Sequence, residues 1–71
     1  MAIYVDRLLN HGWKYGKNCH LTADTEAELL AFAARLGMKR SWLQVSRSGV
    51  LHFDLTAKRR ELAVRLGAIE K

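Results

Sequence analysis

The sequence predicts a small α+β domain in which two helices cover one face of a small antiparallel or mixed sheet. Two segments show helical spacing of apolar residues, and each lies between a capping threonine and a glycine. Runs of β-branched and aromatic residues precede each helical segment, so the expected order of elements is β-β-α-β-β-α. Residues 1–71 are expected to form a single two-layer domain, because 71 residues have room for one core only.

Four predicted strands surround the first helix in the sequence. Residues 2–5 and 19–22 favour strands before it, and residues 13–15 could pair with the second of these across a glycine turn. After the helix, residues 42–46 and 50–53 favour the two strands of a hairpin, with a turn at the Arg-Ser-Gly sequence between them.

Both helices have start and stop signals. Thr25 and Glu28 form a capping box for the first helix, which is expected to end at Gly37. The second helix is expected over residues 57–66, with Thr56 as its N-cap.

The first turn of the second helix carries three cations, although the helix dipole places its positive end there. A phosphate bound to the backbone N–H groups at this end would make the cations favourable. Alternatively, Asp54 neutralises part of the charge and Glu61 pairs with Arg65. The predicted phosphate-binding residues are Thr56, Lys58, Arg59, Arg60 and His52.

A second candidate site consists of Asp6, His20, His52 and Asp54, which lie on or at the ends of predicted strands. Two histidines and a carboxylate could hold a divalent metal with open positions for hydrolysis or oxygen chemistry. Without a metal, they could act as an acid–base pair. The alternative is a purely structural role, in which each histidine only hydrogen-bonds a neighbouring residue. Apart from such a metal, we expect no cofactor.

Tryptophans supply a third candidate. Trp13 lies between two glycines and beside lysines, so it could stack on nucleobases or, alternatively, cap the small core. Trp42 is expected to cap the small core.

Charge and hydropathy limit the partners and the location. The net charge of +5 arises in residues 38–71, which contain eight cations and three anions, so nucleic acid, a nucleotide or an acidic protein is the expected partner. No segment approaches the ~20 apolar residues of a membrane span, and no signal peptide is apparent. We therefore expect a cytoplasmic protein without membrane association. The small core leaves a homodimer open.

A helix-turn-helix is the competing fold for residues 32–49. Ala33, Gly37 and Leu43 have its spacing, and Lys39, Arg40 and Arg47 would approach DNA. The strand-forming residues that follow favour the hairpin instead.

The residues also resemble a known family across almost the whole chain. The matching positions are Tyr4, Val5, Asp6, Trp13, His20, Ala23, Asp24, Glu28, Leu29, residues 31–37, Arg40, Trp42, Gln44, residues 52–55, Ala63 and residues 66–68. The family is one of small, functionally uncharacterised domains of bacteria and their phages. The resemblance implies no established activity. It singles out a polar set, Asp6, Trp13, His20, Gln44, His52 and Asp54, and makes a host-directed or anti-defence role conceivable, such as sequestering a nucleotide signal.

Two positions depart from the family pattern. Leu30 stands where related sequences often have histidine, and Phe53 stands where tyrosine is expected. Both changes weaken a catalytic or metal interpretation.

The sequence therefore predicts a non-catalytic binding module for a nucleic acid or nucleotide. The first alternative is a metal-dependent or acid–base hydrolase or nuclease that uses the candidate residues Asp6, His20, His52 and Asp54. The second alternative is a protein–protein adaptor. The residues alone do not decide whether the protein is an enzyme.

Overall fold

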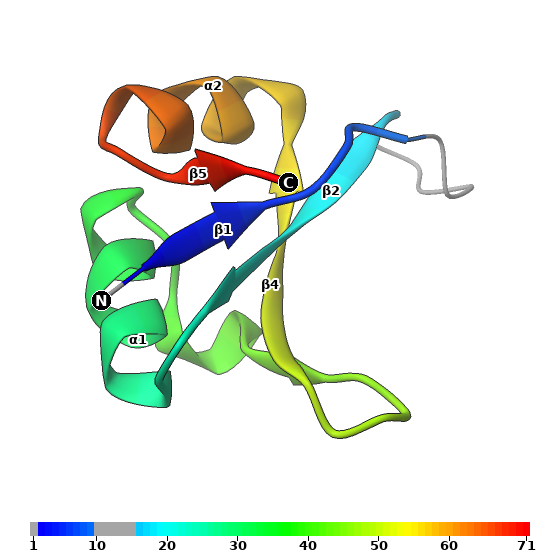
Figure 1. The fold of residues 1–71 in the computed structure, drawn as a ribbon, viewed down its shortest axis with the longest axis vertical. Helices are drawn as coiled ribbons and strands as arrows, with labels where there is room; N and C mark the ends of the chain where they lie inside the picture. The colour runs from blue at the N-terminus through cyan, green and yellow to red at the C-terminus, as the bar shows by residue number, and fades with distance from the viewer. Residues whose placement is uncertain (1, 10–15) are drawn as a thin grey trace.

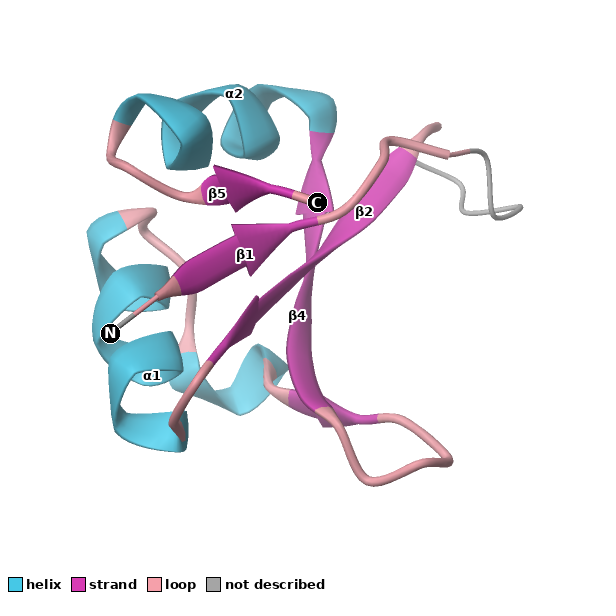
Figure 2. Ribbon diagram, viewed as in Figure 1, coloured by secondary structure: helices cyan, strands magenta, loops and turns pink. Residues whose placement is uncertain are grey.

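The computed structural model describes residues 2–9 and 16–71 as one small two-layer domain (Figures 1 and 2). Its elements in chain order are β1 (Ile3–Val5), β2 (Asn18–Ala23), α1 (Glu26–Arg35), the 3₁₀ helix η1 (Arg40–Trp42), β3 (Gln44–Val45), β4 (Leu51–Thr56), α2 (Ala57–Arg65) and β5 (Ile69–Glu70). The predicted α+β class and its two-layer arrangement are confirmed. In this part of the chain, no helix has the length and apolar character needed to cross a membrane.

The five strands form one mixed sheet in the order β3-β4-β2-β1-β5. Neighbouring strands are antiparallel except for β1 and β5, which are parallel. The two long strands, β2 and β4, lie next to each other at the centre. Side chains of these two strands that oppose one another therefore share a face of the sheet.

The two faces of the sheet have opposite character because the side chains alternate. On one face, Cys19 and Leu21 of β2 and Phe53 and Leu55 of β4 are fully buried. Both helices pack on this face, and their residues in the same core are Leu29, Phe32, Ala33, Leu36 and Ala63. The other face carries polar side chains and has no covering helix in the described part of the chain, as an antiparallel sheet with one solvated side allows (Figure 2).

The helix caps are as predicted. Thr25 accepts a hydrogen bond from the Glu28 backbone N–H, and its hydroxyl donates to the Glu28 side chain. Thr56 accepts from the Arg59 backbone N–H at the start of α2. Each helix is followed by a glycine with positive φ, Gly37 and Gly67.

Two of the three cations at the start of α2, Arg59 and Arg60, have partners within the chain. Arg59 donates through Nε to the Leu36 carbonyl, which lies at the end of α1. Arg60 donates through Nε to the Asp6 carbonyl at 3.0 Å and forms an ion pair with Glu70 at 3.2 Å. These two cations connect α2 to other parts of the fold, which explains their place at an unfavourable end of the helix dipole.

Several boundary predictions are wrong. The predicted strand over 42–46 is a 3₁₀ turn followed by the two-residue β3, because the chain must turn at the sheet edge after α1. Trp42, expected in the core, is 42% exposed. The strand β5 was not predicted, because a strand of two residues is too short to show an alternating pattern. The predicted strand at 13–15 lies outside the described residues. No recognition helix of a helix-turn-helix follows α1 in the described chain.

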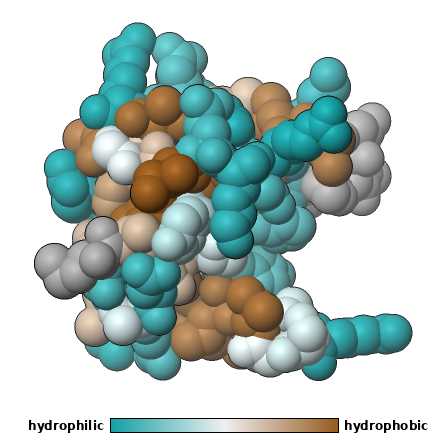
Figure 3. Space-filling view, in the orientation of Figure 1, coloured by the Kyte–Doolittle hydropathy of each residue, from teal (hydrophilic) through white to brown (hydrophobic). Residues whose placement is uncertain are grey.

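Exposed apolar side chains flank the turn of the β3–β4 hairpin, and Figure 3 shows a hydrophobic area at the bottom of the molecule, near its centre. Val45 and Val50 of this hairpin are 62% and 47% exposed. Val50 lines a cavity on the open polar face together with His52, whereas Val45 pairs with Leu51, whose side chain lies on the other face.

Candidate metal centre

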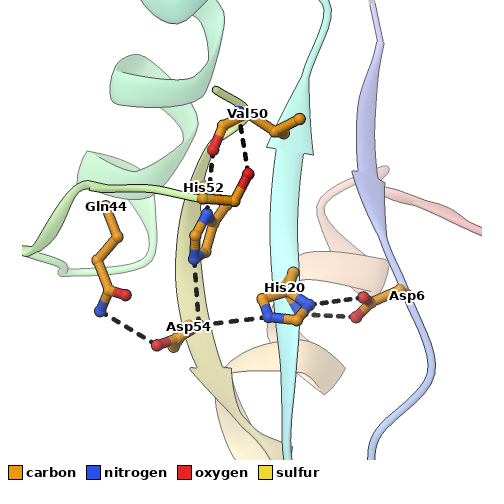
Figure 4. A network of polar contacts seen from close by, with 7 residues as sticks. Asp6, His20, Gln44, Val50, His52 and Asp54 are labelled. Carbon is orange, nitrogen blue, oxygen red and sulfur yellow. Dashed lines mark hydrogen bonds and ion pairs between the residues drawn. The ribbon is translucent and has the colours of Figure 1, made fainter. Parts of the chain in front are cut away.

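The polar side chains of the open sheet face come together because of the strand register. His20 of β2 lies directly opposite Asp54 of β4, and Gln44 of β3 lies opposite His52 of β4. Asp6 follows β1, and its backbone N–H continues the ladder to the His20 carbonyl. Gln44, Asp54, His20 and Asp6 thus lie in a row across the sheet, and His52 lies beside Asp54 on the same strand (Figure 4).

Three of these residues bring one donor atom each to a common point. His20 Nε2 lies 3.8 Å from Asp54 Oδ1, and His52 Nε2 lies 3.7 Å from the same oxygen. The two imidazole rings meet edge to face with centroids 5.0 Å apart. Donor atoms of His20, His52 and Asp54 all lie within 4.8 Å of one another, which is the spacing that a metal ion needs.

The remaining polar atom of each of these side chains is held by a separate partner. His20 Nδ1 lies 2.8 Å from Asp6 Oδ2, while Asp6 Oδ1 accepts from the His20 backbone N–H at 2.6 Å. His52 Nδ1 lies 3.2 Å from the Val50 carbonyl oxygen. Figure 4 shows the Asp6 contact on the far side of His20 from Asp54, and the Val50 contact above His52.

These partners determine which ring nitrogen can bind a metal. A carbonyl oxygen only accepts hydrogen bonds, so the Nδ1 of His52 is the donor toward Val50. The same tautomer suits His20, whose Nδ1 faces the Asp6 carboxylate. In a neutral imidazole of this tautomer, the lone pair is on Nε2, the atom that each histidine directs at Asp54.

Asp54 has one oxygen for each role. Its Oδ2 accepts a hydrogen bond from Gln44 Nε2 at 3.1 Å, and its Oδ1 faces the two histidines. Hydrogen-bond partners of metal ligands, behind the ligands themselves, are typical of metal sites in proteins.

The candidate centre is partly buried. The His52 side chain is 12% exposed, and that of His20 is 39% exposed. All three ligands come from one face of the sheet, so the protein would supply donors from one side only. The opposite side is left to water or substrate, as in catalytic rather than structural metal sites.

Two cavities flank the cluster. One, of about 230 Å³, is lined by His20 and His52 together with Asp6, Thr22, Ser46, Val50 and Lys71. The other, of about 680 Å³, adjoins Asp54 and Gln44 and extends to Trp42 and Arg59. A ligand in either cavity would lie next to a residue of the candidate centre.

The predicted phosphate-binding residues are distributed over two places. Thr56 caps α2, while His52 belongs to the polar cluster on the sheet. Lys58 and Arg59 line a third cavity of about 530 Å³ at the start of α2. Arg60 donates to the Asp6 carbonyl and pairs with Glu70. Phosphate binding at this helix stays a prediction, as does base stacking by Trp13, which lies outside the described residues.

Two residues near the cluster, Val50 and Lys71, could not be predicted from the sequence. The Val50 carbonyl orients His52 through a backbone atom, which every residue type has. Lys71 lines the smaller cavity because β5 runs beside β1, and its Nζ lies 4.9 Å from the centre of the Tyr4 ring. The short β5 was not predicted, so Lys71 could not be placed.

Cys19 is next to His20 in the chain but does not belong to the site. Its side chain points to the opposite face of the sheet and is fully buried. Burial raises the pKa of the Cys19 thiol to about 11, with a smaller contribution from Asp6 in the same direction. The thiol is therefore a core residue and no metal ligand.

Comparisons with curated proteins and with solved structures found no match. The model of one family, described as "Protein of unknown function (DUF4031)", matches residues 3–71. The match includes every element of the fold and all five polar residues of the candidate centre. The resemblance of the sequence to an uncharacterised domain family is thereby confirmed, and the chain belongs to the DUF4031 family.

Proposed function

We propose that this domain is a divalent-metal-dependent hydrolase whose metal is bound by His20, His52 and Asp54. One observation carries the proposal: three donor atoms lie within 4.8 Å, and each of these side chains is held at its other polar atom by a separate partner. Polar side chains that lie together by chance on a solvated sheet do not each need a second hydrogen-bond partner. Metal ligands typically have such a partner, which fixes their orientation.

The chemistry of the donors supports a catalytic metal. Two imidazoles and a carboxylate suit zinc, iron or manganese and leave coordination positions for water and substrate. A divalent metal bound there would supply an activated water and a Lewis acid. The residues of the chain orient the donors. Asp6 and Val50 hold the two imidazoles, and Gln44 holds the carboxylate of Asp54.

Metal binding is tested first. Protein stripped with a chelator is titrated separately with Zn²⁺, Mn²⁺ and Fe²⁺, and the stoichiometry is read by calorimetry and elemental analysis. We expect one equivalent per chain and loss of binding in His52→Ala and Asp54→Ala. Asp24→Ala is the matched control, because Asp24 bonds with Ala2 and Tyr4 outside the cluster. No stoichiometric binding of any of these metals would refute the proposal.

Hydrolysis is tested with chromogenic phosphate monoesters, phosphate diesters and carboxylic esters, each with apo and metal-loaded protein. We expect turnover that requires the metal and is lost in Asp54→Ala. Oxygen uptake by the iron-loaded protein without ester hydrolysis would show that the site is a metal centre of another reaction class.

The binding-module and adaptor functions, the nucleic-acid and acidic-protein partners, the homodimer and the cytoplasmic location stay predictions. The net charge of +5 supports an anionic partner. Fluorescence anisotropy with labelled oligonucleotides at low and high salt tests nucleic-acid binding, because contacts to several phosphates weaken steeply with salt.

A further inference from the structure

The larger cavity beside the candidate metal centre has the size and lining of a small-molecule site. Its volume of about 680 Å³ lies within the range of ligand pockets, roughly 300–1,000 Å³. Asp54 and Gln44 form one part of its wall, and Met38, Trp42 and Arg59 form another. The cavity thus joins a proposed metal ligand to an apolar and a cationic surface.

Trp42 provides an unusual exposed ring in this cavity. Large aromatic side chains of small domains are normally in the core, yet Trp42 is 42% exposed. The Arg59 guanidinium carbon lies 5.6 Å from the centre of the indole ring, so the two planar groups contact each other in the cavity wall. An exposed indole of this kind can stack on a flat heterocycle.

Arg59 differs from the other arginines of α2. Arg60 is paired with Glu70, and Arg65 is paired with Glu61. Among the described residues, Arg59 has no carboxylate partner; its Nε donates to the Leu36 carbonyl, and its guanidinium contacts Trp42. The position of its side chain is therefore set by uncharged groups, and its positive charge is available to an anion in the cavity.

We propose that this cavity binds the substrate of the metal centre and that the substrate is a nucleoside phosphate. Trp42 stacks on the base, Arg59 contacts the phosphate, and the phosphoester lies beside Asp54. This assignment rests on the proposed hydrolase function. In the reaction, water adds to phosphorus, the bond to the ester oxygen breaks, and that oxygen takes up the proton that water loses. The products are a nucleoside and inorganic phosphate.

The volume of the cavity favours one nucleotide over a longer chain. A mononucleotide presents a single base and a single terminal phosphate, which match the exposed indole of Trp42 and the guanidinium of Arg59. Single-stranded nucleic acid shares this chemistry at one nucleotide, so an oligonucleotide is included in the test as the competing ligand.

The experiment titrates AMP, adenosine, ribose 5-phosphate and a short single-stranded oligonucleotide into protein whose metal content has been measured. Binding is followed by calorimetry, in a metal form that turns over too slowly to consume AMP during the titration. We expect AMP to bind at least about tenfold more tightly than adenosine or ribose 5-phosphate, because each of these lacks one of the two contacts.

Matched variants assign the contacts. Trp42→Leu and Arg59→Gln are expected to weaken AMP binding by about tenfold each. Arg59→Lys retains the charge and is expected to weaken it less. Arg65→Gln, whose side chain pairs with Glu61 outside the cavity, is the control and is expected to leave AMP affinity unchanged, while Trp13→Leu and Lys58→Gln test the competing contacts. Thermal melts show which variants are folded, and Arg59→Lys serves as the informative variant if Arg59→Gln unfolds.

The outcomes separate the two proposals. Absence of metal binding refutes the hydrolase function itself. Protein that binds metal but not AMP, or binds it no better than ribose 5-phosphate, overturns the nucleotide assignment and leaves the metal centre intact. Tight binding of the oligonucleotide without binding of AMP overturns the mononucleotide as substrate. Loss of AMP binding in Trp13→Leu, with Trp42→Leu unaffected, overturns the cavity.

Discussion

At the level of single residues, Asp6 has the most demanding role in the candidate centre. Its two carboxylate oxygens accept two different hydrogen bonds from His20, one from the backbone N–H and one from the ring Nδ1. An asparagine at this position would have only one acceptor oxygen. One of the two contacts would then be lost, and with it the fixed orientation of the imidazole.

We therefore predict that Asp6→Asn weakens metal binding by about 10–100-fold, the usual effect of removing a partner that orients a metal ligand. Metal affinity is measured by competition with a chromophoric chelator. Asp24→Asn is the matched control and should leave the affinity unchanged. Equal affinities of Asp6→Asn and the native protein would show that Asp6 does not act through His20.

Tyr4 gives a pH-dependent prediction outside the site. Its hydroxyl donates to Asp24 Oδ1 at 3.1 Å, and this hydrogen bond to a carboxylate raises the pKa of the Tyr4 phenol. A phenolate cannot donate. The contribution of the bond to stability is therefore complete below the pH at which an unfolded tyrosine ionises, and it is lost as the pH rises through the Tyr4 pKa.

Asp24→Ala should lower the Tyr4 pKa toward its ordinary value. The measurement is an alkaline titration of phenolate absorbance in a Tyr15→Phe background, where Tyr4 is the remaining tyrosine. An unchanged midpoint in Asp24→Ala would contradict the assigned cause of the shift.

At the level of elements, α2 shows how side chains override a general preference. The helix dipole disfavours all three cations of its first turn. Arg59 and Arg60 have carbonyl partners on α1 and after β1, whereas Lys58 is exposed and has no ion-pair partner among the described residues. Lys58 therefore has no such contact in the described part of the chain to offset the unfavourable interaction of its charge with the helix dipole.

Charge reversal at Lys58 and at Arg60 should change the stability of the fold in opposite directions. Lys58→Glu is expected to stabilise the fold by about 0.3–1 kcal/mol, since it complements the dipole. Arg60→Glu is expected to destabilise it, because it removes the bond to the Asp6 carbonyl and places a second carboxylate beside Glu70. Urea denaturation measures both changes. A destabilising Lys58→Glu would reveal a contact of Lys58 that the fold does not explain.

Sequence patterns predict elements only where an element is long enough to show a period. The caps at Thr25 and Thr56 and the alternation along β4 are local signals, and both were predictable. The two-residue β5 has no period, and its pairing with β1 is a contact between the two ends of the chain. Its absence from the sequence prediction follows from the length of the strand.

The same limit applies to the site. His20, His52 and Asp54 could be predicted as a group because strand alternation places them outside the core. Their approach to within 4.8 Å depends on the register of β2 against β4, which no local pattern encodes. The roles of Val50 and Trp42 depend on a backbone carbonyl and on a turn at the sheet edge, so the sequence could not show them.

At the level of the whole molecule, the candidate centre links the two strands on which the fold is built. His20 is on β2, and His52 and Asp54 are on β4, the two neighbouring central strands that both helices contact. A metal bound by all three would hold these strands together in the folded state. The unfolded chain would not keep the three donors close, so binding would favour folding.

We therefore predict that metal raises the thermal stability of the native domain. At a free metal concentration of about 100 times Kd, the expected gain is about 2.7 kcal/mol. In a domain of this size, each kcal/mol shifts Tm by about 4–8 °C, so the total shift is on the order of 10–20 °C. Calorimetric melts of apo and metal-loaded protein measure it.

Asp54→Ala and Asp24→Ala make this prediction specific to the centre. The first should show no metal-dependent shift, and the second should show the full shift, because only Asp54 faces the two histidines. Equal shifts in both variants would mean that the metal binds elsewhere on the chain. No shift in the native protein, at a metal concentration that saturates the site by calorimetry, would mean that the donors are not brought together by folding.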